Sequence, residues 1–418
     1  MTRWRWLWLQ MSRRLWLRAS LIGLIGVAAA ILAAVVEKYV PWELDGTIAA
    51  DAVDSLLNII ATSMLAVTTF SLSVMTSAYG AATSNVTPRA TKLLMEDRVT
   101  QNVLSTFIGT FLFGIVGIVV LRVGAYGDRG RVILFAVTIL VIVLIVVTLL
   151  RWIDHLTRLG RVGETTNRVE EAARTAIEAR LAAPYLGGAP LADHEKDVPS
   201  GAAAVTAPEI GYVQHIDIAA LDRLAEKLGS EIHVVLNPGA FVYSDTVLAW
   251  TWGALNDDQI DSMRNAFSIA AERSFDQDPR FGLAVMSEIA SRALSPATND
   301  PGTAIDVIGR TTRLMSAWAA DNDVQPEPEY TRVKVAPLTD ADLFEDAFML
   351  IGRDGAALIE VQMRLQKSLL ALARIGRTSF QKAAREQSLL ALDRSREAMK
   401  SKFDSDRLDA LQRPPSAP

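Results

Sequence analysis

The sequence predicts an α-helical membrane protein, with four transmembrane helices followed by a C-terminal cytosolic α+β region. Of the 418 residues, 50% are hydrophobic, and the mean hydropathy of +0.23 exceeds what a soluble chain rich in Ala, Arg and Glu normally shows. The apolar residues gather in the first third of the chain. There, four stretches reach the roughly 20 residues that cross the hydrocarbon core of a bilayer. These stretches are residues 21–40, 53–79, 103–123 and 132–152.

The N-terminal segment 1–19, MTRWRWLWLQMSRRLWLRA, alternates Trp or Leu with Arg. Indole rings favour the headgroup region and Arg pairs with lipid phosphate, so we expect an interfacial segment that leads into the first span. The alternative is an export signal, because paired Arg residues before an apolar run are typical of twin-arginine signals. The three further spans favour retention in the membrane.

Basic residues beside the spans give the orientation, because short loops rich in Lys and Arg stay in the cytoplasm. Several Arg precede the first span, whereas the loop after that span is mainly acidic. The loop after the second span carries Arg89, Lys92 and Arg98. We therefore expect a multi-pass protein of the bacterial inner membrane, with both termini in the cytosol.

The second span carries polar side chains along one face, because they recur every three or four residues. These candidate cavity-lining residues are Asp51, Ser55, Asn58, Thr62, Thr69, Ser73 and Thr76. One interpretation is helix packing, where a hydrogen bond contributes only about 0.6 kcal/mol. The other is a wetted cavity with Asp51 at its outer mouth, which favours cations over anions. A pore requires a homo-oligomer, since four helices leave little room for one in a single chain.

The third and fourth spans differ in kind. Small residues in the third span permit close helix approach, so we expect it inside the bundle. These helix-packing candidates are Thr106, Gly109, Thr110 and Gly114. The fourth span is apolar all round and should be the most exposed to lipid.

The rest of the chain divides by composition. Arg, Glu and Ala at helical spacing predict an extension of the fourth span, and a Pro- and Gly-rich stretch predicts a linker. Beta-branched runs between turn residues predict a small β-rich module, followed by helices. In order, the domains are the interfacial segment 1–19, a transmembrane domain 20–153, a helical extension 154–183, a linker 184–208, the β-rich module 209–252, a mainly helical domain 253–403 and a disordered tail 404–418.

Within these domains, helices are expected at 218–228, 257–275, 279–294, 301–321, 342–374 and 379–402, and a strand at 331–336.

Three blocks carry a family resemblance: TFSLSVMTSAYGAATSNVTPRATKLLMEDRVTQNVLSTFIGTF, GYVQHID with NPGAFV, and ERSFDQDPRFGLAVMSEIASRALSPATNDPGTAID. In these blocks the chain resembles the bacterial family of predicted membrane proteins called domain of unknown function twenty-two fifty-four. The resemblance implies an integral inner-membrane protein and supplies no activity, substrate or cofactor.

Signatures of enzymes are absent from the sequence. The histidines 155, 194, 215 and 233 lack the spacing of a zinc site, and Cys is absent. Neither a phosphate-binding Gly-rich loop nor a nucleophile elbow occurs. We therefore expect no enzyme, no metal and no cofactor. Mixed charges without a basic stripe also exclude nucleic acid as a partner.

One region of the soluble part suggests a ligand-binding loop. Two helices there begin with Asp-Pro, and Arg and amide side chains lie nearby in the sequence. The candidates are Arg273, Asp278, Arg292, Asn299 and Asp300. If they converge, they would hold a small anionic ligand, because helix N-termini favour negative charge. The alternatives are simple N-capping by the two Asp residues and a subunit contact.

Three functions then compete. The first is an oligomeric ion channel or transporter with a cytosolic regulatory domain, supported by the polar second span. The alternative is a membrane-anchored scaffold or signalling protein without transport activity. An enzyme has the least support, because no catalytic constellation is present.

The charge distribution predicts that a reporter fused after Pro418 is active only if it functions in the cytosol. Fusions to a cytosol-dependent and a periplasm-dependent reporter test this. Activity of the periplasm-dependent fusion would overturn the four-span topology.

Overall fold

The computed structural model describes the chain at Trp6, Met11 and residues 15–36, 50–124, 126–191, 201–320 and 327–412. Most of the interfacial segment predicted at 1–19 therefore lies outside the described residues. The chain divides into two compact units. The helical unit consists of Leu7–Ser84 and Thr91–Thr165, and the mixed unit consists of Met1–Trp6, Asn85–Ala90 and Thr166–Pro418.

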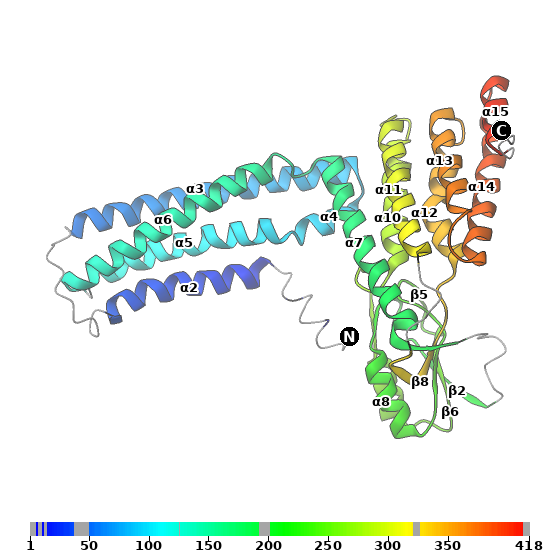
Figure 1. Cartoon of the computed structure of the whole chain (residues 1–418). Helices are drawn as coiled ribbons and strands as arrows, with labels where there is room; N and C mark the ends of the chain where they lie inside the picture. Colours follow the sequence, from blue (N-terminus) through cyan, green and yellow to red (C-terminus); the bar gives the residue numbers. More distant parts are fainter. Residues whose placement is uncertain are drawn as a thin grey trace. The chain divides into compact units, whose positions relative to one another are not determined.

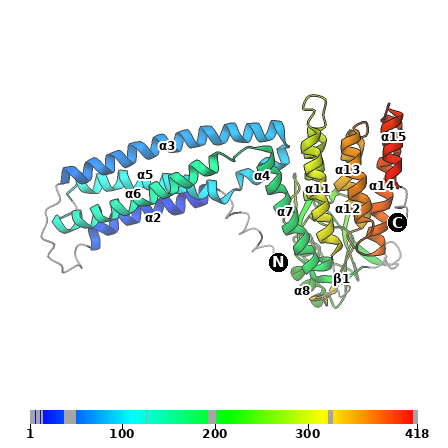
Figure 2. The same ribbon diagram turned by 45° about the horizontal axis from the view of Figure 1, so that its top comes forward.

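Long helices lie side by side in the helical unit (Figures 1 and 2). They are α2 (Leu15–Val36), α3 (Ala50–Asn85), α5 (Arg98–Arg122) and α6 (Asp128–Leu156), with the short α4 (Pro88–Met95) between α3 and α5. Among the described residues, three stretches are long and apolar enough to cross a membrane: Asp51–Asn85, Arg98–Arg122 and Gly130–Leu156. The apolar part of α2, Leu17–Leu32, is shorter. Three of the four expected spans thus have structural support, and the span at 21–40 stays a prediction.

The three candidate spans differ in how far the chain covers them. The buried share is 50% in α5, 28% in α3 and 17% in α6. This confirms that α5 lies inside the bundle and that α6 is the most exposed of the three. Met64, Phe107 and Trp152 pack into one apolar cluster, while Leu57 and Phe113 belong to a second.

A polar network joins α3, α5 and α6. Asp97 caps α5 by accepting hydrogen bonds from the backbone N–H and the hydroxyl of Thr100, at 2.9 and 2.6 Å. The same carboxylate lies 2.9 Å from His155 Nε2. One turn away, Trp152 donates to Ser71 Oγ at 2.8 Å. Because these groups are buried or nearly so, mutual pairing removes the penalty of burying them.

Two sheets form the β part of the mixed unit. The five-stranded sheet has the order β1-β8-β4-β6-β2, in which β1, β8 and β4 are parallel and the other pairs are antiparallel. The second sheet, β5-β3-β7, is antiparallel. The strands are β1 (Gly188–Pro190), β2 (Ala202–Thr206), β3 (Gly211–Ile216), β4 (Ile232–Val234), β5 (Phe241–Val242), β6 (Val247–Trp252), β7 (Phe267–Ala270) and β8 (Tyr330–Val335).

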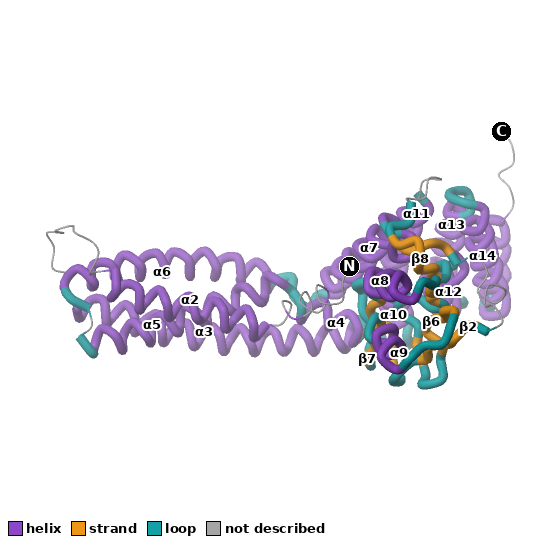
Figure 3. Tube along the Cα trace, turned by 90° about the horizontal axis from the view of Figure 1, so that it is seen from below, coloured by secondary structure: helices purple, strands orange, loops and turns teal. Residues whose placement is uncertain are grey.

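Helices complete the mixed unit. They are α7 (Val162–Ala182), α8 (Ile218–Leu228), α9 (Asp257–Arg264), α10 (Pro279–Ala293), α11 (Pro301–Ala319), α12 (Asp340–Asp354), α13 (Ile359–Leu372), α14 (Thr378–Ala398) and α15 (Lys402–Asp409). Helices α10 to α14 stand side by side (Figure 1), while α8 and α9 lie with the strands in Figure 3. Helix α8 packs on β4 and β8, and α10 packs on α11 and α12.

The sequence sets these helix boundaries by capping. Asp217 accepts from Ala220 N at the start of α8, and Gly229, with a φ of 61°, ends that helix. Helices α10 and α11 begin with Asp-Pro, in which the Asp caps the helix and the Pro fits its first turn. The expected helices at 218–228, 279–294 and 301–321 and the expected strand at 331–336 are therefore present, within one or two residues of their predicted ends.

Helix α7 is bound to α11 by a buried carboxylate. Glu170 is 9% exposed and accepts hydrogen bonds from Arg310 and Arg313 at 2.9 and 3.0 Å. Arg174 of α7 lies 3.3 Å from the same carboxylate, and three cations around one carboxylate offset the penalty of its burial.

Several predicted boundaries are wrong. Helix α6 ends at Leu156 and a turn precedes α7, so the fourth span does not continue as one helix through 154–183. The supposed linker 184–208 contains β1 and β2, which gain stability only from strands distant in sequence. The helix expected at 257–275 stops at Arg264, and β7 follows. The helix expected at 342–374 is two helices. Residues 402–409 form α15, partly inside the expected tail 404–418, whose last residues lie outside the described chain.

Helix α7 approaches α10 at Gly282, where a Cβ would lie 2.7 Å from Ala173 Cα. Gly282→Ala should therefore lower the free energy of unfolding by about 1–3 kcal/mol, because neither backbone has room to move. Thermal unfolding of the full chain in detergent measures this.

Gly309→Ala on α11 is the matched control, since a Cβ added there would have no atom within 4 Å. It should raise stability by roughly 0.5–1 kcal/mol through helix propensity. Equal effects of the two substitutions would contradict the close α7–α10 contact.

Candidate functional site

The polar stripe of α3 lies on the face opposite the helix's own packing contacts. Thr62 is exposed, and Met64, about 200° further round the helix, is buried. Ser73 and Met75 differ in the same way. The whole predicted set is exposed in the single chain: Asp51, Ser55, Asn58, Thr62, Thr69, Ser73 and Thr76. Packing inside the chain's own bundle therefore does not account for the stripe.

Hydroxyls of the stripe donate to their own helix. Thr69, Ser73 and Thr76 donate to the carbonyl oxygens of Leu65, Thr69 and Leu72 at 2.9, 3.1 and 2.9 Å. Such bonds one turn back satisfy a hydroxyl without a partner helix. Asn58 differs, because no partner of its amide occurs among the described residues.

The small residues of α5 face two different helices. A Cβ on Gly109 would lie 3.0 Å from the carbonyl oxygen of Ile22 in α2, and one on Gly114 would lie 3.1 Å from that of Leu57 in α3. Thr110 is buried and Thr106 is half-buried. The glycines thus permit close backbone approach on two sides of α5.

The five candidates for a ligand loop do not converge. Arg273 pairs with Asp278 at 2.7 Å, and Asp278 also accepts from Phe281 N. Arg292 lies in the last turn of α10, and Asn299 and Asp300 follow that end of the helix; all three are on the surface. A helix of 15 residues separates the two groups by about 20 Å. Hydrogen bonds from the Thr303 hydroxyl and backbone N–H lower the pKa of Asp300, as expected of a capping carboxylate.

A buried arginine that the sequence did not single out connects the elements of the mixed unit. Arg180, near the end of α7, is 5% exposed. Its guanidinium donates to Asn237 Oδ1 at 3.0 Å and to the carbonyl oxygen of Gln277 at 3.4 Å. The Asn237 amide in turn donates to the carbonyl oxygens of Ala336 and Pro337, both at 3.2 Å. Arg180 Nε is buried and makes no hydrogen bond.

The turn after β4 packs on the Arg273–Asp278 pair. Gly239 has a φ of 95°, and a Cβ there would meet the Asp278 carboxylate and lie 2.9 Å from Arg273 Nη2. Only glycine adopts this positive φ without strain and also lacks the Cβ for which there is no room. The NPGAFV and SFDQDP blocks, far apart in the sequence, thus meet beside Arg180.

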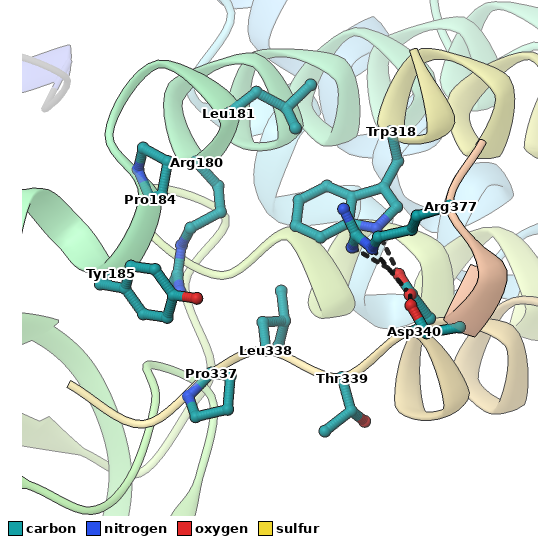
Figure 4. A pocket seen from close by; sticks show the side chains of 11 residues that line it. Arg180, Leu181, Pro184, Tyr185, Trp318, Pro337, Leu338, Thr339, Asp340 and Arg377 are labelled. Atoms are coloured by element: carbon teal, nitrogen blue, oxygen red, sulfur yellow. Dashed lines mark hydrogen bonds and ion pairs between the residues drawn. The ribbon is translucent and has the colours of Figure 1, made fainter. Parts of the chain in front are cut away.

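Arg180 lines a pocket of about 380 Å³ in the mixed unit (Figure 4). Figure 4 shows Arg180 and Tyr185 on one side, Trp318 and Arg377 on the other, and the segment Pro337 to Thr339 below. The lining residues are Arg180, Leu181, Pro184, Tyr185, Trp318, Pro337, Leu338, Thr339, Asp340, Arg377 and Ser379.

One carboxylate of this pocket is fully engaged. Asp340 accepts from Trp318 Nε1 at 2.9 Å, from Arg377 at 2.6 and 2.9 Å and from Ser379 Oγ at 2.6 Å. Burial raises its pKa, but hydrogen bonds from Arg377, Ser379 and Trp318 outweigh burial and leave the pKa lowered. Asp340 therefore stays ionised and neutralises Arg377.

The pocket wall at Tyr185 is strained. Tyr185 and Leu186 have φ values of 54° and 59°, in the left-handed region that costs a non-glycine residue about 1–2 kcal/mol. Residues held in this region cluster at functional sites.

Sequence reasoning missed Arg180 because nothing around it forms a motif. The sequence offered only an indirect signal, because Asn237, Gly239 and Asp278 lie in two of the three blocks that carried the resemblance. Asn237 binds Arg180, and Gly239 packs on Asp278 beside it.

Part of the chain is similar to uncharacterized mycobacterial proteins. An uncharacterized protein of Mycobacterium bovis is 36% identical over 128 residues, which cover 29% of this chain and 25% of that protein. Uncharacterized proteins of two Mycobacterium tuberculosis strains match over the same length at 36% and 35% identity. The chain thus spans about a quarter of the length of these relatives. No solved structure matches the chain.

The family model described as predicted membrane protein (DUF2254) matches residues 12–371. This match includes α2, α3, α5 and α6 of the helical unit and most of the mixed unit. The chain therefore belongs to the DUF2254 family of predicted membrane proteins, whose function is unknown.

Proposed function

We propose that the chain forms a homo-oligomer in the bacterial inner membrane, in which α3 helices of neighbouring copies enclose a water-filled path for small cations. Both termini would lie in the cytosol, and the mixed unit would act as a regulatory domain. The observation that carries this proposal is the direction of the α3 stripe, since its polar side chains occupy the face that the chain itself leaves uncovered.

A surface that faces lipid should be apolar, because polar groups inside a membrane turn toward protein or water. The exposed face of α6 meets this expectation with Leu140 and Val143, which are 69% and 54% exposed. The exposed surface of α3 has apolar residues as well, such as Leu65 and Phe70 at 53% and 64% exposed, but it also carries Asn58, Thr62 and Thr69. The contrast within one chain favours a protein or water neighbour for α3.

The chemistry of the stripe favours cations. Asp51 supplies a carboxylate near the start of α3, Asn58 an amide oxygen, and the Ser and Thr residues hydroxyl oxygens. Rings of such groups, repeated by symmetry in an oligomer, attract cations and replace part of their hydration shell.

A scaffold or signalling protein without transport is the second candidate. The hydroxyl bonds of Thr69, Ser73 and Thr76 to their own helix favour it, because such hydroxyls tolerate a dry contact between copies. In that case α3 would be packed against α3 of a neighbour, with no water between them.

The absence of native cysteine allows a clean accessibility test. Thr62→Cys, Thr69→Cys and Ser73→Cys should react with a membrane-impermeant thiol reagent, because water would reach them. Leu140→Cys and Val143→Cys should not react, although these positions are also exposed in the single chain. Mass spectrometry of protein labelled in membranes gives the extent of reaction.

Disulfide crosslinking separates the remaining outcomes. If Thr69→Cys stays unlabelled but forms a disulfide between copies, α3 helices of neighbouring copies are in dry contact. This result would overturn the proposal of a water-filled path and favour the scaffold. Absence of both labelling and crosslinking would mean that the stripe faces lipid and would overturn both candidates.

Cation flux tests the path directly. In proteoliposomes, the wild-type chain should carry K⁺ faster than Cl⁻, and Thr69→Trp should abolish that flux by filling the path. Leu140→Trp is the matched control and should leave flux unchanged. Equal flux in liposomes with and without protein would contradict the proposal.

A further inference from the structure

We infer that the mixed unit binds a small organic anion, a carboxylate or phosphate with a flat apolar body, in the pocket beside Arg180 (Figure 4). The inference stands on the mixed unit alone and does not depend on a path through the membrane.

The charge of Arg180 lacks a direct counterion. Among the described residues no carboxylate lies within ion-pair distance of its guanidinium, and its two hydrogen bonds go to neutral oxygens. The carboxylate that acts on it through space, Asp278, is already bound by Arg273 at 2.7 Å. Burial lowers the pKa of Arg180 to about 10, so the group remains charged at neutral pH. A buried cation of this kind is stabilised by an anion.

Arg180, a residue of the pocket lining, also has one donor without a partner. Nε is buried without a hydrogen-bond partner, although a buried donor that stays unpaired costs about 1–3 kcal/mol. Asn237 and the Gln277 carbonyl hold the outer nitrogens of the guanidinium in place. An anionic group of a ligand would complete the pairing that the protein leaves open.

The remaining charges of the pocket cancel. Arg377 and Asp340 bind each other at 2.6 Å, which leaves Arg180 as the charged residue of the lining that has no direct counterion.

The shape and lining select an apolar body. A volume of about 380 Å³ falls in the range of small-molecule sites, which begin near 300 Å³. Trp318 and Tyr185 provide rings, and Leu338 an aliphatic contact. The pocket also lies beyond the carboxyl end of β8, the edge at which open α/β sheets commonly bind ligands.

The test uses the full chain in detergent, with calorimetry and thermal unfolding. The probes are phenyl phosphate and benzoate, which separate the phosphate and carboxylate sources, together with inorganic phosphate and benzyl alcohol as the anionic and apolar halves. Phenyl phosphate or benzoate should bind more tightly than either half and should raise the melting temperature.

Two substitutions locate the site. Arg180→Gln should weaken binding at least about 30-fold, the loss typical of removing one partner of a buried charge pair. Arg292→Gln, the same change at the far end of α10, should leave binding unchanged. Leu338→Trp keeps Arg180 and all capping residues, fills the pocket and should also abolish binding, so that the test survives if Arg180→Gln does not fold.

Three results would overturn the inference. One is the absence of binding by both ring-bearing anions. Another is equal binding of benzyl alcohol, which would make the charge irrelevant. The third is loss of binding in Arg292→Gln with retention in Leu338→Trp, which would move the site to the loop at the far end of α10.

Discussion

The mixed unit depends on the hydrogen bonds of one buried guanidinium. A buried charge must be surrounded by acceptors, and Arg180 obtains them from Asn237 and from the carbonyl of Gln277. Asn237 supplies its oxygen in the correct direction because its amide is fixed on Ala336 and Pro337. In this way the end of α7, the turn after β4, the start of α10 and the exit from β8 meet at one point. The pocket opens at this meeting point, so its walls are held by the same bonds that hold the fold.

Elements with local causes could be predicted from the sequence, and elements with distant causes could not. Asp-Pro starts at α10 and α11, and the apolar lengths of α3, α5 and α6, are local signals, and all five helices are present. Strands β1 and β2 resemble linker in the sequence because short Ala- and Gly-rich runs form strands only when another strand pairs with them. Strand β7 resembles the end of a helix for the same reason. The functional residues follow the same division. The stripe on α3 is periodic and visible in the sequence. Arg180, in contrast, is identified only by its hydrogen bonds to Asn237 and Gln277, which lie far from it along the chain.

Both units bury paired polar groups, but the helical unit also has a row of polar side chains on its outer surface. In the mixed unit, polar side chains such as Glu170 and Asp340 are buried and bound by several donors. In the helical unit, Thr62 and Thr69 lie outside, and the interior is held by apolar side chains, by glycine contacts and by a few polar pairs such as Trp152 with Ser71. A soluble domain gains from apolar residues inside, but a bilayer removes that gain, because lipid is as apolar as leucine. The fold of the helical unit therefore does not require the polar side chains on the outer face of α3.

The strand order has a consequence for biosynthesis. Strand β8 lies between β1 and β4, yet it begins only at Tyr330, after α10 and α11 have been made. Until the ribosome reaches that residue, β1 has no neighbour and β4 exposes one edge. Unpaired edges of this kind invite pairing with other chains, and closing them by contacts distant in sequence is slow. The nascent chain therefore passes through a period in which its central sheet is open, and a chain that stops before Tyr330 would remain in that aggregation-prone state.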